Sequence, residues 1–448
     1  MGSARHRPDA ADRAEPTRAP QRPAWFAIAF TVLIALTPAM PHVALGSTGL
    51  DVTDLPALAA AVIGLWAALR YPQWRAVRLT RAPEVWALAA IVPFTLIAAL
   101  RADSVHSLAA GPARWAFNAV LVACAYLLLR TRADGVRMLR ALVAVATFEA
   151  LFGLAAYALK WVGPGGYIGI SFNGGKIGGM PVWGRITGTT GMASTFVGGL
   201  FALALPVAVG LAMAAVRGRR WPWVASAVVI FFGLAFTLSR VPIALGTGAV
   251  VVLLLASTRP RVWVPTVTVG LVLFLATPLR ARMTNFSTDR VPLWEVGWRM
   301  FTDNWAFGVG PGNYLTYMPQ YQIPGEPAAP VTPHNSLLYV ASESGVFAAL
   351  ALAVAIGVAL RFVASRRALV LAPTLGFIAF ALNAMTTNLF SIASMAIAAW
   401  MLAPAVAAIR RGDRPADPVI LAGRGDDASA PTGNPGGRSV GSTAEVTP

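Results

Sequence analysis

Charged residues are scarce in this 448-residue chain. Only 12% of its residues are charged and 56% are hydrophobic, with a mean hydropathy of +0.63. Soluble globular domains carry about 25% charged residues. This balance excludes an ordinary soluble enzyme and a disordered chain. The single cysteine, Cys124, permits no internal disulfide and no cysteine cluster around a metal.

Histidine is also rare, with four residues in the chain. No two of them have the spacing of metal ligands, and the acidic residues expected outside the membrane are scattered. We therefore expect neither a metal site nor a cofactor.

Long apolar runs fill most of the chain between residues 24 and 411. A helix needs about 20 such residues to cross the hydrocarbon core of a bilayer. We expect an all-α polytopic membrane protein with about twelve spans. These are Trp25–Met40, Val52–Leu69, Pro83–Leu100, Trp115–Leu129, Val136–Val162, Ala193–Val216, Trp221–Leu238, Val241–Thr258, Val262–Leu279, His334–Leu360, Ala368–Met385 and Leu389–Ile409.

The net charge of +17 would suggest nucleic acid in a soluble protein. If both termini are cytoplasmic, however, 26 of the 36 basic residues fall in inner segments and ten in outer ones. Segments rich in arginine and lysine stay inside the plasma membrane. Most of the basic charge therefore indicates topology, and we expect no nucleic-acid partner.

The spans define the domain organisation. Residues 1–23 and 412–448 have the composition of disordered cytoplasmic tails, and the first precedes a full-length span, unlike a cleaved signal peptide. The membrane domain is expected over 24–411. Between spans nine and ten lies the large extracytoplasmic loop, 280–333, and a second, glycine-rich outer segment covers about 162–192.

The loop 280–333 contains a segment with helical spacing of apolar residues, Leu293–Phe301. This pattern predicts a short amphipathic helix on the membrane surface. The turn that follows, Gly308–Asn313, lacks the lysine and hydroxyl residue of a P-loop.

Span ten begins with Thr332 as a plausible N-cap and Pro333 as a natural first helical residue. His334 would then lie in the first turn, where the helix dipole disfavours imidazolium. A neutral imidazole can act as a general base near neutral pH. The alternative is a histidine that caps the helix or lies at the membrane interface.

Arg240 lies between spans seven and eight, at a predicted helix start. An arginine beside a helix N-terminus makes a good phosphate site. The alternative is an arginine that extends toward lipid headgroups. Glu149, inside span five, could pair with Arg140 or be functional, and the sequence does not decide between these.

Three short motifs follow one another in the second half of the chain. The first is Ser-Arg at the outer end of a span. The second is Arg-x-x-x-Trp followed by Gly-Val-Gly-Pro-Gly-Asn, and the third is His-Asn-Ser-x-Leu followed by Glu-x-Gly. Their residues are Ser239–Arg240, Arg290, Trp294, Gly308–Asn313, His334–Ser336, Leu338, Glu343 and Gly345. In this order they resemble the O-antigen ligase and polymerase superfamily of bacterial membrane glycosyltransferases. Gly184–Thr190 resembles an earlier outer motif, but its usual Asn-Pro-Asn continuation is replaced by Gly191–Ala193.

The resemblance implies a transferase of the plasma membrane whose site faces outward. Its donor would be a glycan on undecaprenyl diphosphate. By this resemblance His334 is the general base, and Arg240 and Arg290 bind the diphosphate, without a metal and with inversion at the anomeric carbon. Further contacts to the diphosphate or the sugar would come from Arg185, Asn335, Glu343 and Trp294.

The acceptor is not settled by these motifs. In a ligase it would be a sugar of lipid A–core, which we favour, and in a polymerase it would be another lipid-linked repeat. A transporter or flippase for lipid-linked glycans also fits twelve spans, but transporters usually show internal repeats around a midplane site. A non-catalytic scaffold would give Arg240, Arg290 and His334 no reason to converge.

Overall fold

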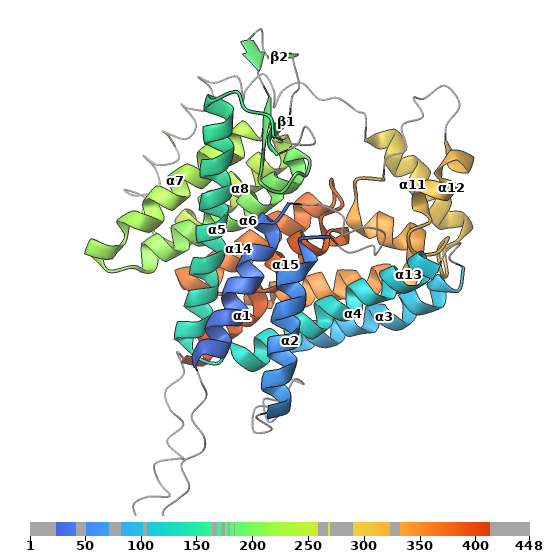
Figure 1. Ribbon diagram of the computed structural model, residues 1–448, viewed down its shortest axis with the longest axis horizontal. Helices are drawn as coiled ribbons and strands as arrows, with labels where there is room; N and C mark the ends of the chain where they lie inside the picture. The colour runs from blue at the N-terminus through green and yellow to red at the C-terminus, as the bar shows by residue number, and fades with distance from the viewer. Residues whose placement is uncertain are drawn as a thin grey trace, which may run out of the picture.

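The computed structural model describes residues 24–41, 51–70, 82–101, 105–163, 168–171, 175–177, 180–182, 184–258, 268, 290–322 and 332–412. Most of these residues are helical (Figure 1). The long helices are α1 (Ala24–Leu36), α2 (Asp54–Arg70), α3 (Pro83–Ala99), α4 (Val105–Leu128), α5 (Arg132–Ala158), α6 (Ser194–Ala214), α7 (Trp221–Phe236), α8 (Arg240–Ser257), α11 (Val291–Asp303), α13 (Ser336–Ala359), α14 (Ala368–Ala384) and α16 (Leu402–Gly412). The short ones are α12 (Tyr314–Tyr321), α15 (Ala393–Trp400), and the 3-10 turns η1 (Thr37–Ala39), η5 (Arg217–Arg219), η6 (Leu360–Phe362) and η7 (Leu389–Ser391).

Helices occupy every expected span that falls within the described residues. The expected ninth span, Val262–Leu279, lies outside them. Within the described residues, six helical segments are long and apolar enough to cross a membrane, and four shorter apolar helices accompany them. The chain is therefore a multi-pass membrane protein. The six segments are Gly111–Leu128, Arg132–Ala158, Ser194–Ala214, Arg240–Ser257, Ser336–Phe362 and Ala393–Gly412.

Two helix boundaries differ from the expected spans. Helix α4 begins at Val105, ten residues before the expected Trp115, because Arg114 interrupts an apolar run without opposing helix formation. The last expected span is divided at Met401 into α15 and α16.

The glycine-rich segment after α5 forms strands, which the all-α expectation did not include. Strand β1 (Gly169–Ser171) pairs antiparallel with β4 (Arg185–Gly188), and β2 (Gly175–Ile177) pairs with β3 (Met180–Val182). Strand β4 packs against α5, where Gly153 leaves room for the buried side chain of Ile186. The contact between Ile186 and Gly153 thus holds β4 against the spanning helix α5.

Helices α6 and α14 form the centre of the bundle. Helix α6 packs against α5, α7, α8 and α14, while α13 packs against α3, and α3 against α4. Small residues allow close helix contact in membranes, and Gly376 of α14 faces the backbone of Leu203 in α6. Figure 1 shows α7 and α8 on one side of this centre and α11 and α12 beside α13 on the other.

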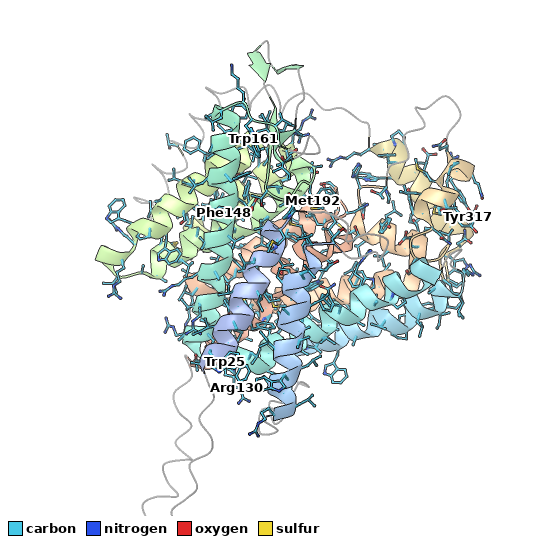
Figure 2. The ribbon with its side chains drawn as sticks, viewed as in Figure 1. Trp25, Arg130, Phe148, Trp161, Met192 and Tyr317 are labelled. Atoms are coloured by element: carbon cyan, nitrogen blue, oxygen red, sulfur yellow. The ribbon has the colours of Figure 1, made fainter. Side chains whose placement is uncertain are left out.

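Large apolar side chains also point outward from the helices. Val62 is 66% exposed and Trp25 is 51% exposed, as expected where lipid rather than water surrounds the surface. In Figure 2, Trp25 and Arg130 lie at one end of the helices α1 and α5, and Trp161 lies at the opposite end of α5. Other outward residues are Leu65, Trp66, Phe148, Leu151, Phe232, Val252, Phe347, Leu350 and Val354.

Candidate functional site

The tight turn between α7 and α8 carries Arg240. Leu238 has a positive φ of 53°, and Ser239 is the N-cap of α8. The Thr237 hydroxyl donates to the Leu234 carbonyl at 2.6 Å and accepts from Ser239 N at 3.3 Å. The helix start predicted here is confirmed, and it makes the half-buried Arg240 the first residue of α8.

Arg185 reaches the same turn from the start of β4. Its Nε donates to the Thr237 carbonyl at 2.8 Å, and its Nη2 donates to Ser239 Oγ at 2.7 Å. Two of its N–H groups therefore hold the residues that precede Arg240. Contact of Arg185 with a substrate stays a prediction, but the structure gives this arginine a structural task that the sequence did not reveal.

Arg290 immediately precedes α11, and its carbonyl accepts from Trp294 N at 3.0 Å. The inner face of α11, with Val296 and Met300, is buried. Helix α11 packs against α13, where the Ser342 hydroxyl donates to the Gly297 carbonyl at 2.9 Å. The predicted short helix with one apolar face is confirmed, while its place on the membrane surface stays a prediction. Its packing against α13 determines where Arg290 lies.

The charge of Arg240 acts on Arg290, an arginine of a different motif. Burial lowers the pKa of the Arg290 guanidinium, and the positive charge of Arg240 lowers this pKa further. Like charges repel unless an anion lies between or beside them. A diphosphate bound here would remove this repulsion.

His334 lies just before α13 rather than in its first turn. The helix begins at Ser336, and Asn335 Oδ1 caps it by accepting from Leu338 N at 3.1 Å. The prediction of Thr332 as N-cap is therefore wrong: asparagine caps at least as well as threonine. His334 itself has a φ of 50°, a conformation in which histidine is enriched among non-glycine residues.

The surroundings of His334 favour the neutral form of its imidazole. Burial lowers the pKa of His334 below its ordinary value of 6.5, and the charge of Arg290 lowers it further. A neutral imidazole was expected from the sequence, but on account of the helix dipole. Together, these electrostatic effects link Arg240 to Arg290, and Arg290 to His334.

The Gly308–Asn313 turn docks on a break in α13. Gly345 has a φ of 80°, which interrupts the helix. Carbonyl groups before this residue and an N–H group after it can therefore bond to residues outside the helix. Val309 N donates to the Ser342 carbonyl at 2.9 Å, and Gly310 N donates to the Glu343 carbonyl at 3.0 Å. On the far side of the break, Val346 N donates to the Trp305 carbonyl at 2.8 Å. The segment Trp305–Gly310 is thus bonded to α13 on both sides of Gly345, so the Gly308–Asn313 motif and the Glu-x-Gly motif lie together.

The Glu343 side chain lies beneath this turn and is only 6% exposed. Its Oε1 accepts from Tyr314 N at 3.3 Å, and the Tyr339 hydroxyl donates to the same carboxyl group. These contacts orient the turn, and they do not join Glu343 to the cluster of Arg240, Arg290 and His334. A substrate contact of Glu343 stays a prediction.

Trp294 is half-buried on α11, one turn from Arg290. Its indole Nε1 is buried and has no hydrogen-bond partner within the described part of the chain. A buried N–H group normally has an acceptor. An oxygen of a bound substrate would supply one.

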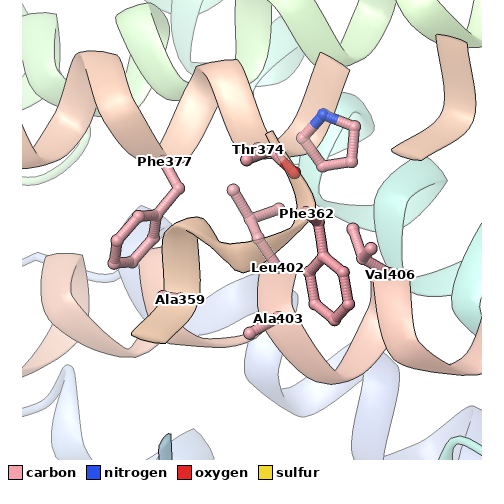
Figure 3. Close-up of a pocket in the computed structure, with 8 residues that line it drawn as sticks. Ala359, Phe362, Thr374, Phe377, Leu402, Ala403 and Val406 are labelled. Carbon is pink, nitrogen blue, oxygen red and sulfur yellow. The ribbon is translucent and has the colours of Figure 1, made fainter. Parts of the chain in front are cut away.

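A small cavity lies elsewhere in the bundle, between α13, α14 and α16 (Figure 3). Its volume of about 10 Å³ suits at most one water molecule. Its lining is almost entirely apolar and lies at the end of α13 remote from His334, so it is not a substrate site. The lining residues are Ala359, Phe362, Pro373, Thr374, Phe377, Leu402, Ala403 and Val406.

Among the described residues, no three histidine, cysteine, aspartate or glutamate side chains gather where they could hold a metal ion. The charged groups that do gather at the candidate site are the guanidinium groups of Arg240 and Arg290.

Residues 225–353 match the family model described as O-antigen ligase. No curated protein matches the sequence. The matched segment contains Arg240, Arg290 and His334. It begins after Arg185, which therefore lies outside it. It also includes the Gly308–Asn313 turn and the break in α13. The resemblance drawn from the motifs is confirmed: residues 225–353, which carry the three motifs, match the O-antigen ligase family model.

Proposed function

We propose that this protein transfers a glycan from undecaprenyl diphosphate to an acceptor hydroxyl at the outer face of the bacterial plasma (inner) membrane. In this proposal it is an O-antigen ligase, and the acceptor is a sugar of lipid A–core. The O-antigen ligase match over 225–353 supports the donor class. The ligase reaction and its acceptor are the finer part of the proposal.

One observation carries the proposal: burial and the charge of Arg290 lower the pKa of His334, and the charge of Arg240 in turn lowers the pKa of Arg290. A neutral imidazole can accept a proton, whereas neighbouring guanidinium groups favour a polyanion. A reaction that needs both is the attack of a sugar hydroxyl on a sugar diphosphate.

In the proposed step, the acceptor oxygen forms a bond to the anomeric carbon of the donor while its proton passes to His334. The bond between that carbon and the phosphate oxygen breaks, and its electron pair leaves with undecaprenyl diphosphate. Arg240 and Arg290 stabilise the charge that develops on the leaving group. Attack opposite the diphosphate inverts the anomeric configuration.

Other residues contribute to binding or position in this proposal. Trp294 donates its buried indole N–H, which has no partner among the described residues, to the diphosphate or the sugar. In this proposal Arg185, Asn335 and Glu343 border the substrate site. Arg185 also holds the turn before Arg240, and Asn335 caps the helix that follows His334. Glu343 holds the residue after the Gly308–Asn313 turn.

The test is glycan transfer by purified protein in liposomes, with an undecaprenyl-diphosphate-linked glycan and lipid A–core. We expect His334→Ala to abolish covalent transfer at an unchanged protein level. Arg299→Ala is the matched control, because Arg299 is an exposed arginine that pairs with Glu295 on the outer side of α11. Wild-type transfer by His334→Ala would overturn the proposed base.

A deletion strain separates ligase from polymerase. Loss of glycan attachment with accumulated long lipid-linked polymer indicates a ligase, and single-repeat products indicate a polymerase. Movement of the lipid-linked glycan across liposomes without a covalent product would instead indicate a flippase.

A further inference from the structure

Glu149 is a completely buried acidic residue in the spanning helix α5. The sequence left open a pairing with Arg140, but Arg140 lies 5.6 Å from the ring of Trp223. No ion pair to Glu149 occurs among the residues that the structure describes. An ionised carboxylate that is buried without a cation loses its hydration uncompensated, so burial favours the neutral acid.

The Glu149 carboxyl group instead contacts Thr189, which follows β4. Glu149 Oε2 accepts from Thr189 N at 2.8 Å, and Glu149 Oε1 lies 2.5 Å from Thr189 Oγ1. Thr189 Oγ1 also lies 2.5 Å from the carbonyl oxygen of Ala39 in η1. Three oxygens therefore meet in a row, with the hydroxyl in the middle.

The number of protons shared by these three oxygens decides whether the Glu149 carboxyl group is neutral or ionised. A threonine hydroxyl donates one hydrogen bond, and the Ala39 carbonyl can only accept. If Thr189 donates to Ala39, the contact with Glu149 is a hydrogen bond only when the carboxyl group supplies a proton. If Thr189 donates to a carboxylate, its hydroxyl oxygen and the Ala39 carbonyl are left as two facing acceptors.

We propose that Glu149 is a neutral carboxylic acid that clamps the Arg185–Thr189 segment between α5 and η1. Its Oε1–H donates to Thr189 Oγ1, the Thr189 hydroxyl donates to the Ala39 carbonyl, and Glu149 Oε2 accepts from Thr189 N. Every polar atom in the row then has a partner. Gly188 supports the contact, because its φ is 64° and a Cβ at this position would collide with Glu149 Oε2.

This clamp acts on the candidate site through a short path. Thr189 directly follows β4, and β4 begins at Arg185, which holds Ser239 next to Arg240. Glu149 is thus a positioning residue for Arg240, a role that rests on the proposed function. Its protonation does not rest on that function.

The first test is infrared spectroscopy of the purified full-length protein in lipid nanodiscs at neutral pH. The difference spectrum between the wild type and Glu149→Gln should show the loss of one C=O stretching band of a protonated carboxyl group. Loss of a carboxylate band instead would overturn the proposal. This readout is independent of glycan transfer, so it separates a failure of the clamp from a failure of the proposed reaction.

The second test compares three variants in the transfer assay. Glutamine reproduces the acid, because its amide N–H can donate to Thr189 Oγ1 and its oxygen can accept from Thr189 N. We expect Glu149→Gln to keep kcat and KM within about twofold of the wild type, and Glu149→Ala to lose about tenfold or more in kcat/KM. Thr189→Val should resemble Glu149→Ala, because valine keeps the shape without the hydroxyl.

A glutamine variant as impaired as the alanine variant would overturn the proposal, since a neutral donor would then not suffice. Equal, undiminished activity of all three variants would overturn the positioning role.

Discussion

Arg185 donates a hydrogen bond of 2.7 Å to Ser239, across 54 residues of sequence. This contact joins the strand β4 to the N-cap of α8, and Arg240 is the next residue along the chain. The arginine that the motifs assign to substrate thus also determines the position of another arginine. Coupling of this kind is measurable.

The first prediction concerns this pair. Arg185→Ala and Ser239→Ala should each lower kcat/KM, and the double variant should lose less than the two single losses predict, by about 0.5–3 kcal/mol of coupling energy, because both variants remove one shared contact. A double-mutant cycle in the transfer assay measures this. Additive losses would show that Arg185 does not act through Ser239.

The second prediction concerns pH. Because burial and Arg290 lower the pKa of His334, the base form persists below the ordinary histidine value, and kcat/KM should fall only as the pH drops below 6.5. Arg290→Gln removes a positive charge, raises the pKa of His334 and should shift the acidic limb to higher pH. Profiles of kcat/KM against pH report groups of the free enzyme. An unshifted limb in Arg290→Gln would contradict the link between these residues.

The third prediction separates arginine from a simple positive charge. Arg290→Lys should lower kcat/KM by about tenfold or more, because lysine cannot make the bidentate contact of guanidinium with a phosphate. The matched control is Arg299→Lys, at an exposed position of the same helix. It should retain activity within about twofold, as expected for a surface ion pair. Full activity of Arg290→Lys would argue against direct diphosphate contact.

The fourth prediction concerns the break in α13. Gly345→Ala should lower the free energy of unfolding by about 2 kcal/mol or more, because φ is 80° and the new Cβ would meet the Ala306 carbonyl. Gly357→Ala, later in the same helix, introduces a Cβ with nothing within 4 Å and should not destabilise the protein, because alanine favours a helix more than glycine does. Thermal unfolding in detergent compares the two. Equal stability of both variants would remove the structural need for Gly345.

The fifth prediction is that transfer continues in EDTA. Arg240 and Arg290 are proposed to stabilise the leaving group, so removal of divalent cations should leave the rate unchanged within about twofold. The measurement compares initial rates with EDTA and with added Mg²⁺ or Mn²⁺. A strict requirement for a divalent cation would contradict the proposed metal-independent mechanism.

Much of the fold could be predicted because local rules govern it. Apolar runs of the right length predict helices, and α11 was predicted from the spacing of its apolar residues. The strands β1 and β4 were missed, since each is only three or four residues long and their pairing joins positions 14 residues apart or more. The early start of α4 was missed because the apolar run used to predict the span begins only after Arg114, whereas the helix continues through this charged residue.

The sequence by itself determined the membrane class, the helices and the identity of the motifs, because composition, apolar periodicity and short patterns are local properties. Only the tertiary structure decided what several of those residues contact. It assigned the cap of α13 to Asn335, placed the Glu343 carboxyl beneath the Gly308–Asn313 turn, and joined Arg185 to Ser239 and Glu149 to Thr189. Contacts between distant residues depend on how the helices pack, and no local pattern encodes them.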